Sequence, residues 1–153
     1  MSAVPIPQLH YRRMRAADLA EVAQLEKSLY AFPWSLGNFR DSVNAGYDCW
    51  TVTHGERVIG YAILMIALDE AHLLNVAIAP EWQNQGIGRA FLKHIIAVAK
   101  SAACQIIYLE VRPSNVAARH LYRTMGFQQI AIRPEYYPAV SGREDALFLG
   151  LTL

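Results

Sequence analysis

The spacing of apolar residues changes twice within the first 45 positions. Alternating side chains over Leu9–Arg15 predict a strand. A stripe at spacings of three and four follows, made of Leu19, Val22, Leu25 and Leu29. This stripe predicts a helix over residues 16–30, which Pro33 terminates. Ser35 is a favourable N-cap residue, so we expect a second, shorter helix over Ser35–Ala45.

The middle of the chain has the pattern of β-structure. Cys49–Thr53, Val58–Ala67 and Ala71–Ala79 are predicted strands, and the turn residues His54–Arg57 join the first two as a hairpin. The run over Val58–Ala67 is almost uninterrupted in its apolar character. Such a run predicts a strand that is buried on both faces.

The second half alternates helices and strands. Residues 87–102 predict a helix with one apolar side made of Phe91, Ile95, Val98 and Ala102. A strand is expected over Ile106–Val111, followed by a helix that Ser114 caps and Gly126 ends. Residues 127–133 and 145–152 predict two final strands, joined by a loop that holds residues 136–138. The order β-α-α-β-β-β-α-β-α-β-β predicts one mixed α/β sheet with helices on both faces.

Composition narrows the classes of function. With 153 residues, 54% of them hydrophobic, the chain suits one domain, expected over residues 9–153 after a short tail of residues 1–8. Fourteen basic and 13 acidic residues leave a net charge of +1, which argues against direct nucleic-acid binding. Residues 1–8 lack the features of a signal peptide, and no apolar run is long enough to span a membrane. We therefore expect a cytoplasmic protein without membrane contact.

Cysteine and histidine spacing carries little chemistry. Cys49 and Cys104 do not form a CxxC pair, so we expect no disulfide framework and a reducing compartment. The five histidines have no ligand spacing and no HExxH motif occurs, so no metal is expected.

The segment Gln83–Arg89 is the most informative one. It places Gly86 and Gly88 between a predicted strand and a predicted helix. Glycines let a ligand approach the backbone, and the free N–H groups of a helix N-terminus favour an anion such as a phosphate. The spacing is not that of a P-loop or of a dinucleotide-binding GxGxxG motif. Alone, such a turn is equally compatible with a purely structural role.

With its surroundings, the motif Q-x-x-G-x-G resembles the pyrophosphate loop of the GCN5-related N-acetyltransferases, which use acetyl-CoA. The expected element order is similar to that fold over nearly the whole chain. Further segments resemble the RimI subfamily, which acetylates the N-terminal alanine of ribosomal small-subunit protein eighteen. These segments are residues 31–35, 109–112, 114–118, 121–127, 136–138 and 142–146.

The resemblance implies two catalytic residues. Glu110 lies on the face of its strand that holds Tyr108 and Arg112, and a carboxylate there must be solvated, paired or functional. The resemblance makes it the general base that takes the proton of the attacking amine, whereas a salt bridge with Arg112 is the structural alternative. Tyr122 would be the general acid that protonates the leaving thiolate, and core packing is its alternative.

The remaining roles are also implied by the resemblance. Ten residues would bind acetyl-CoA: Val76, Ala77, Ile78, Asn84, Gln85, Gly86, Ile87, Gly88, Arg89 and Asn115. Asn115 is equally a helix-capping residue, and Arg89 equally part of a solvated helix face. Four residues would bind the acceptor: Phe32, Trp34, Tyr136 and Tyr137.

The expected reaction is direct transfer to the N-terminal alanine of a ribosomal small-subunit protein in a ternary complex. A small amine or another protein is an alternative acceptor, and a CoA-sensing module without turnover is an alternative of another class. Whether a partner protein takes part stays open.

Overall fold

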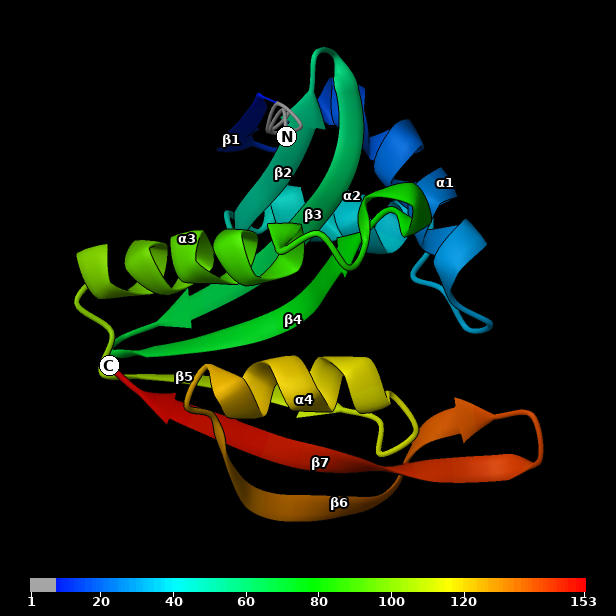
Figure 1. The fold of residues 1–153 in the computed structure, drawn as a ribbon, viewed down its shortest axis with the longest axis vertical. Helices are drawn as coiled ribbons and strands as arrows, with labels where there is room; N and C mark the ends of the chain where they lie inside the picture. The colour runs from blue at the N-terminus through cyan, green and yellow to red at the C-terminus, as the bar shows by residue number, and fades with distance from the viewer. Residues whose placement is uncertain (1–7) are drawn as a thin grey trace, which may run out of the picture.

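The computed structural model describes residues 8–153, so residues 1–7 of the expected tail lie outside the described part. One seven-stranded sheet with the strand order β1-β2-β3-β4-β5-β7-β6 forms the centre of the fold (Figure 1). It is mixed, because only β4 and β5 pair in parallel and the other neighbours are antiparallel. The strands are β1 (Leu9–Arg13), β2 (Asp48–His54), β3 (Arg57–Ala67), β4 (Glu70–Ile78), β5 (Ile106–Val111), β6 (Gln128–Ala139) and β7 (Gly142–Thr152).

Helices cover both faces of this sheet, as its sequence pattern predicts. They are α1 (Leu19–Leu29), α2 (Leu36–Asn44), α3 (Ile87–Ser101) and α4 (Val116–Thr124), with short 3-10 turns at Ala16–Asp18 and Pro80–Trp82. Helices α3 and α4 lie in front of the sheet in Figure 1, and α1 and α2 lie behind it. Each face therefore has its own core, one around Phe91 and Leu109 and the other around Phe39 and Tyr61.

The predicted order of elements is confirmed, and so are several local details. The Ser35 hydroxyl accepts a hydrogen bond from the Asn38 N–H, and the Asn38 side chain accepts one from the Ser35 N–H. This reciprocal pair starts α2 at the expected residue. The apolar run of β3 is buried from Val58 to Leu64, as expected for a central strand with a core on each side.

Three local predictions are wrong. The buried stripe of α3 includes Ala99, whereas Ala102 is exposed beyond the end of the helix. Asn115, rather than Ser114, caps α4, because its side-chain oxygen accepts from the Ala118 N–H. Tyr136–Pro138 belong to β6 instead of a loop, since β6 and β7 continue to a tight turn at residues 140–141.

The pairing of β4 with β5 creates the opening where the site lies. It runs only from Glu70–Ile106 to Leu73–Leu109, although both strands continue further (Figure 1). A register shift on the other side of β4 leaves Leu74 without a partner on β3. Such a bulge bends a strand and strengthens its twist. The bent end of β4 therefore separates from β5, and the edge that it turns toward β5 has no strand partner.

Candidate functional site

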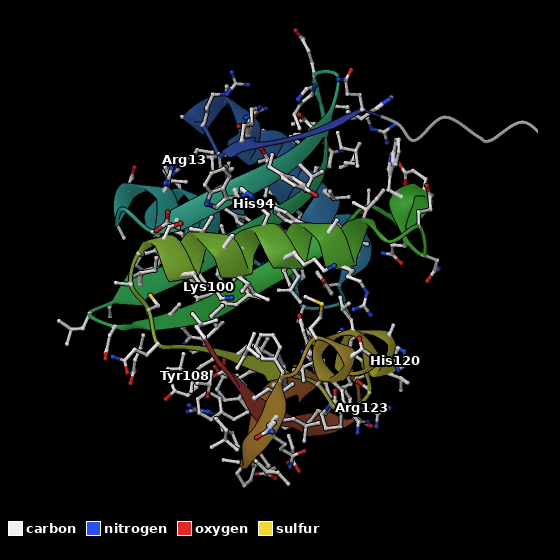
Figure 2. The ribbon with its side chains drawn as sticks, turned by 60° about the vertical axis from the view of Figure 1, so that its left-hand side comes forward. Arg13, His94, Lys100, Tyr108, His120 and Arg123 are labelled. Carbon is white, nitrogen blue, oxygen red and sulfur yellow. The ribbon has the colours of Figure 1, made fainter. Side chains whose placement is uncertain are left out.

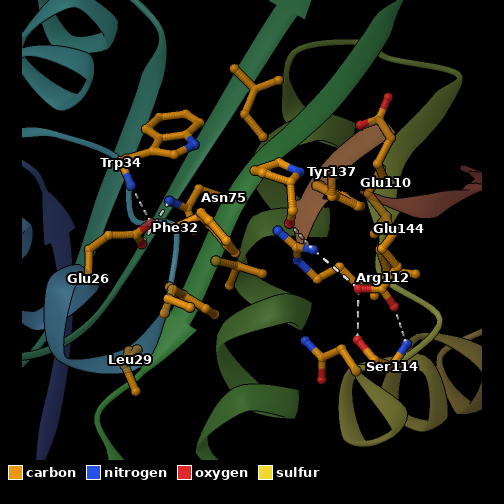
Figure 3. Close-up of a pocket in the computed structure, with 18 of the residues that line it drawn as sticks. Glu26, Leu29, Phe32, Trp34, Asn75, Glu110, Arg112, Ser114, Tyr137 and Glu144 are labelled. Carbon is orange, nitrogen blue, oxygen red and sulfur yellow. Dashed lines mark hydrogen bonds and ion pairs between the residues drawn. The ribbon is translucent and has the colours of Figure 1, made fainter. Parts of the chain in front are cut away.

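The separated strands enclose a cavity of about 750 Å³ (Figure 3). Its walls come from the end of α1 and the following loop, from β4, from β5, from the start of α4 and from the β6–β7 hairpin. Seven residues singled out from the sequence line it: Phe32, Trp34, Val76, Glu110, Asn115, Tyr122 and Tyr137. Three carboxylates, those of Glu26, Glu110 and Glu144, also lie in its walls.

Glu110 is a nearly buried carboxylate of this cavity, with 8% of its side chain exposed. Its Oε2 lies 2.5 Å from His72 Nε2, and its Oε1 lies 3.5 Å from Arg133 Nε. The parallel register pairs His72 with Tyr108, which lies on the same face of β5 as Glu110. The expected alternative, a salt bridge between Glu110 and Arg112, is wrong, because Arg112 pairs with Glu144.

Glu144 and Arg112 join the hairpin to the start of α4. The Glu144 carboxylate accepts hydrogen bonds from the Ser114 N–H at 2.9 Å and hydroxyl at 3.0 Å, and Arg112 Nη1 lies 3.2 Å away. The Ser114 hydroxyl, and with it Arg112, lowers the pKa of Glu144. Arg112 also stacks over the Tyr137 ring at 4.3 Å. The hydroxyl of Ser114 is therefore engaged by a residue 30 positions away, which is why it does not cap α4.

Tyr122 has features of both alternatives that the sequence allows, a core residue and a residue of the site. It is only 7% exposed and its ring packs 5.6 Å from that of Phe127, so it is a core residue. It also lines the cavity. Burial raises the pKa of its phenol well above the usual value of 10, which keeps the hydroxyl protonated at physiological pH.

The expected cofactor residues fall into two groups. Val76 and Asn115 line the cavity, whereas Ala77 and Ile78 are buried on β4 and contribute only backbone toward the open side of the sheet. Residues 84–89 lie beyond the cavity, at the start of α3. The side chain of Asn115 is used in capping α4, so the helix-capping alternative holds for that residue.

The glycine loop has the conformation that its sequence suggests. Gly86 is the N-cap residue of α3, with a φ of +81° that disfavours other side chains. No atom lies within 4 Å of the point where its Cβ would be, so the backbone here faces open space. Arg89 does not extend over a free helix face, because its Nη2 donates to Thr124 Oγ1 at 2.6 Å and so joins α3 to α4.

The four expected acceptor residues are not all in the cavity. Phe32 and Trp34 line it from the loop between α1 and α2, and Tyr137 lines it from β6. Tyr136 is not among the residues that line the cavity, and 45% of it is exposed. Its ring packs edge-on against that of Tyr137 at 4.9 Å, so it contacts the cavity wall through Tyr137.

Sequence reasoning missed His72 and Glu26. Glu26 is 3% exposed and accepts hydrogen bonds from Tyr61, Asn75 and the Trp34 N–H. A glutamate at the end of a helical stripe that is otherwise apolar was a visible signal, since carboxylates are rarely buried without a role. His72 had no such signal, because its place beside Glu110 depends on the strand register.

The described residues contain neither a metal-binding cluster nor a membrane-spanning helix. Within residues 8–153, His, Cys, Asp and Glu form no group of three or more suited to a metal ion. Figure 2 shows that His94 is on α3 and His120 on α4, with Lys100 near the end of α3. No helix in that part of the chain is both long and apolar enough to cross a membrane.

Comparison with known proteins gives consistent matches. Residues 16–127 match the model of the acetyltransferase (GNAT) family. The ribosomal protein bS18-alanine N-acetyltransferase of Escherichia coli K12 is 38% identical over 140 residues, which cover 92% of this chain and 95% of that protein. A crystal structure of the Escherichia coli ribosomal-protein-S18-alanine N-acetyltransferase superposes with a TM-score of 0.89 at 36% identity, covering 95% and 94% of the two chains.

A more distant structure shares the fold. The Arabidopsis thaliana NAA60 protein, solved in complex with acetyl-CoA, has a TM-score of 0.85 at 18% identity, with 95% of this chain and 100% of that chain covered.

Proposed function

The chain belongs to the GNAT acetyltransferase family, and on that premise we propose that it transfers the acetyl group of acetyl-CoA to the N-terminal alanine of a ribosomal small-subunit protein. The observation that carries the proposal is the cavity between β4 and β5, with a nearly buried carboxylate on one wall and a buried phenol on another. An acceptor of this kind agrees with a cytoplasmic location.

The open edge of β4 fits the pantetheine arm of acetyl-CoA. The pairing with β5 ends at Leu73, so the backbone groups of Val76–Ile78 on that side have no strand partner. An extended amide chain can pair with such an edge as an added strand does. Gln83 Nε2 donates to the Ile78 carbonyl, which leaves the groups around Val76 for the ligand. A backbone N–H there polarises the thioester carbonyl.

The start of α3 fits the pyrophosphate. Its first N–H groups have no partner within the helix, and the helix dipole adds partial positive charge at that end. The open space at Gly86 lets a phosphate approach the backbone of Gln85–Gly88. Asn84, at a φ of +61°, turns the chain into this loop. Arg89 links α3 to α4 through its hydrogen bond with Thr124, and so holds in place the helix that begins at this loop.

Glu110 is the proposed general base. A peptide α-amino group has a pKa of roughly 7.7–8.0, so most of it is protonated at neutral pH and unable to attack. The Glu110 carboxylate accepts that proton, directly or through one water, while the amine nitrogen bonds to the thioester carbon. His72 and Arg133 contact its two oxygens and fix their orientation. Glu110 therefore lies in a largely buried position with a polar partner at each of its oxygens.

Tyr122 is the proposed general acid. When the tetrahedral intermediate collapses, the carbon–sulfur bond breaks and the CoA thiolate leaves. The raised pKa of Tyr122 keeps its phenol protonated, so that it can donate to this sulfur. The amine nitrogen begins as an ammonium group and ends as an amide N–H, so it loses two protons: Glu110 takes the first, and water takes the second as the intermediate collapses. The proton held by Glu110 then passes through water to the Tyr122 phenolate, which restores the enzyme with the net release of one proton.

The aromatic walls favour a small first residue in the acceptor. Phe32 and Trp34 face Tyr137 across the opening, and Arg112 lies between them, 5.9 Å from the Phe32 ring and 4.3 Å from the Tyr137 ring. With Arg112 between these rings, the space beside them would admit alanine more easily than a large side chain. The carboxylates of Glu110 and Glu144 suit a cationic peptide end.

Mass spectrometry of ribosomal proteins from cells with and without the gene tests this proposal. We expect one small-subunit protein with an N-terminal alanine to lose its acetyl group when the gene is absent. If instead a metabolite amine or an internal lysine loses acetylation, the acceptor is wrong and the alternative acceptor class holds. If purified protein binds acetyl-CoA but releases no CoA thiol with any amine, the chain is a CoA-sensing module.

A further inference from the structure

We propose that Glu26 is a positioning residue that holds the Phe32–Trp34 wall of the cavity and thereby sets the size of the acceptor's first residue. The inference rests on the proposed function, because it concerns how the residue bearing the reactive amine is admitted. Glu26 itself does not reach the reacting atoms in this account. It acts through the loop between α1 and α2.

Glu26 is a buried carboxylate that is satisfied entirely by hydrogen bonds. Its Oε1 accepts from the Tyr61 hydroxyl at 2.6 Å. Figure 3 shows the other two bonds, from Asn75 Nδ2 to Oε1 at 3.0 Å and from the Trp34 N–H to Oε2 at 2.9 Å. No Lys, Arg or His in the described part of the chain forms an ion pair with it. Burying a carboxyl group is costly unless hydrogen bonds replace its hydration, and these three bonds do so.

The three donors come from parts of the molecule with different rigidity. Tyr61 is on β3 and Asn75 on β4, two central strands that hold these side chains in fixed places. Trp34 is in the loop that follows α1. Glu26 therefore links a loop to the sheet, and the Trp34 N–H is the point of attachment.

The attachment at Trp34 fixes the position of the Phe32–Trp34 wall, and with it the space for the acceptor's first residue. The Trp34 ring packs on Phe39 at 5.2 Å, while the exposed Phe32 ring lies two residues away and forms the outer wall opposite Arg112. Without the bond to Glu26, the segment that carries Phe32 has lost its polar attachment to the sheet. The loop can then move outward and admit a larger first residue.

The direction of each hydrogen bond predicts how substitutions behave. A backbone N–H can only donate, whereas the Tyr61 hydroxyl and the Asn75 amide can each accept after rotating. In Glu26→Gln, the amide oxygen can keep the Trp34 bond while the amide nitrogen donates to Tyr61 and Asn75. In Glu26→Ala, no acceptor remains for the Trp34 N–H. A positioning role therefore predicts rescue by glutamine.

Peptide kinetics with three variants test the inference. Glu26→Ala is expected to raise KM for a peptide beginning with alanine about tenfold and to lower the preference for alanine over leucine about fivefold, the kind of loss that a displaced binding wall causes. The KM for acetyl-CoA should not change. Glu26→Gln should stay near the wild-type values. Glu21→Ala is the matched control, since Glu21 joins the same helix to the Val58 N–H outside the cavity.

Three results would overturn the inference. The first is an unchanged acceptor KM and first-residue preference in Glu26→Ala. The second is an equal defect in Glu26→Gln, which would assign the effect to charge. The third is fast hydrogen exchange of the Trp34 amide in the wild-type protein, and this measurement decides even if Glu26→Ala does not fold. Failure of the wild-type protein to acetylate any peptide N-terminus would instead contradict the proposed function.

Discussion

Glu110→Gln is the substitution that separates a catalytic carboxylate from an ion-pair partner. The two side chains have the same shape, and glutamine can still form a hydrogen bond with the His72 ring and lie beside Arg133. Proton acceptance is the property that is lost. General base catalysis is worth about 10²–10⁴-fold in rate, which corresponds to roughly 3–5 kcal/mol in the activation barrier.

The structure separates this loss from a loss of stability. Glu110 has 8% of its side chain exposed, whereas 25% of His72 and 47% of Arg133 are exposed, so water can hydrate both of these side chains without it. We therefore expect the free energy of unfolding to fall by only about 1 kcal/mol. Chemical denaturation measures this value, and saturating peptide and acetyl-CoA give kcat for the same preparation.

The pH dependence of the defect provides the second test. Roughly a tenth of the α-amino group is neutral at pH 7 and almost all of it at pH 9.5, given a pKa of roughly 7.7–8.0. The ratio of wild-type to variant kcat should therefore shrink by up to about tenfold over this range. Glu144→Gln, which removes another carboxylate of the same cavity, should show no such convergence.

Two results would refute the reasoning about Glu110. A variant with near wild-type kcat at pH 7 would make the residue a structural partner of His72 and Arg133. A large defect that stays constant from pH 7 to pH 9.5 would show that Glu110 contributes something other than proton acceptance.

Three further perturbations test other parts of the account. Gly86→Val should abolish acetyl-CoA binding, because it adds a branched side chain at a φ of +81° where the backbone must approach the phosphates. Calorimetry measures this affinity, and an unchanged value would place the phosphates elsewhere. Tyr122→Phe should lower kcat at least about tenfold without changing acetyl-CoA affinity, and since burial raises the pKa of this phenol, wild-type kcat should not fall up to pH 9.5. A loss of stability that matches the loss of activity would make the hydroxyl structural. Arg12 lowers the pKa of Asp18 from 3.8 to about 2, so Asp18→Asn should lower the free energy of unfolding by about 2 kcal/mol at pH 7. This difference should persist above pH 3.8 and disappear as the pH falls through 2. Equal losses at pH 7 and pH 2 would contradict this prediction.

The order of elements was predictable because apolar spacing reports it directly. Buried positions recur with the period of a helix in α1 and α3 and run without a break in β3, where both faces are covered. The errors arose where a distant residue decides the outcome. Ser35 and Ser114 look alike as N-cap residues, but only Ser114 forms a hydrogen bond with a distant carboxylate, that of Glu144 in the β6–β7 hairpin.

The loop expected at Tyr136–Pro138 failed for a related reason. Prolines disfavour strands because they lack an N–H, yet β6 is the last strand of the sheet and one of its edges has no partner. Pro138 can therefore continue the strand opposite Arg143. Which strand lies at the edge is a property of the topology, and the local sequence does not contain it.

The candidate site was predictable in its residue types and incomplete in its contacts. Glu110 could be found because a carboxylate interrupts an apolar strand, and the glycine loop because its spacing is distinctive. The partners of Glu110 and Arg112 could not, since they depend on strand register and on a hairpin that returns from more than 20 residues away.

The central claim is that the site acetylates a protein N-terminus. It is tested most directly by letting a peptide α-amine and a lysine side-chain amine compete, in two peptides of the same composition. One peptide begins with Ala-Arg and carries a free N-terminus, and the other has a blocked N-terminus and a free internal lysine, whose pKa is roughly 10.4. Mass spectrometry of the products, with acetyl-CoA present, should find the acetyl group on the α-amine of the first peptide, and replacing its alanine by leucine should lower kcat/KM sharply. Faster acetylation of the internal lysine would contradict the account of this site as one for protein N-termini.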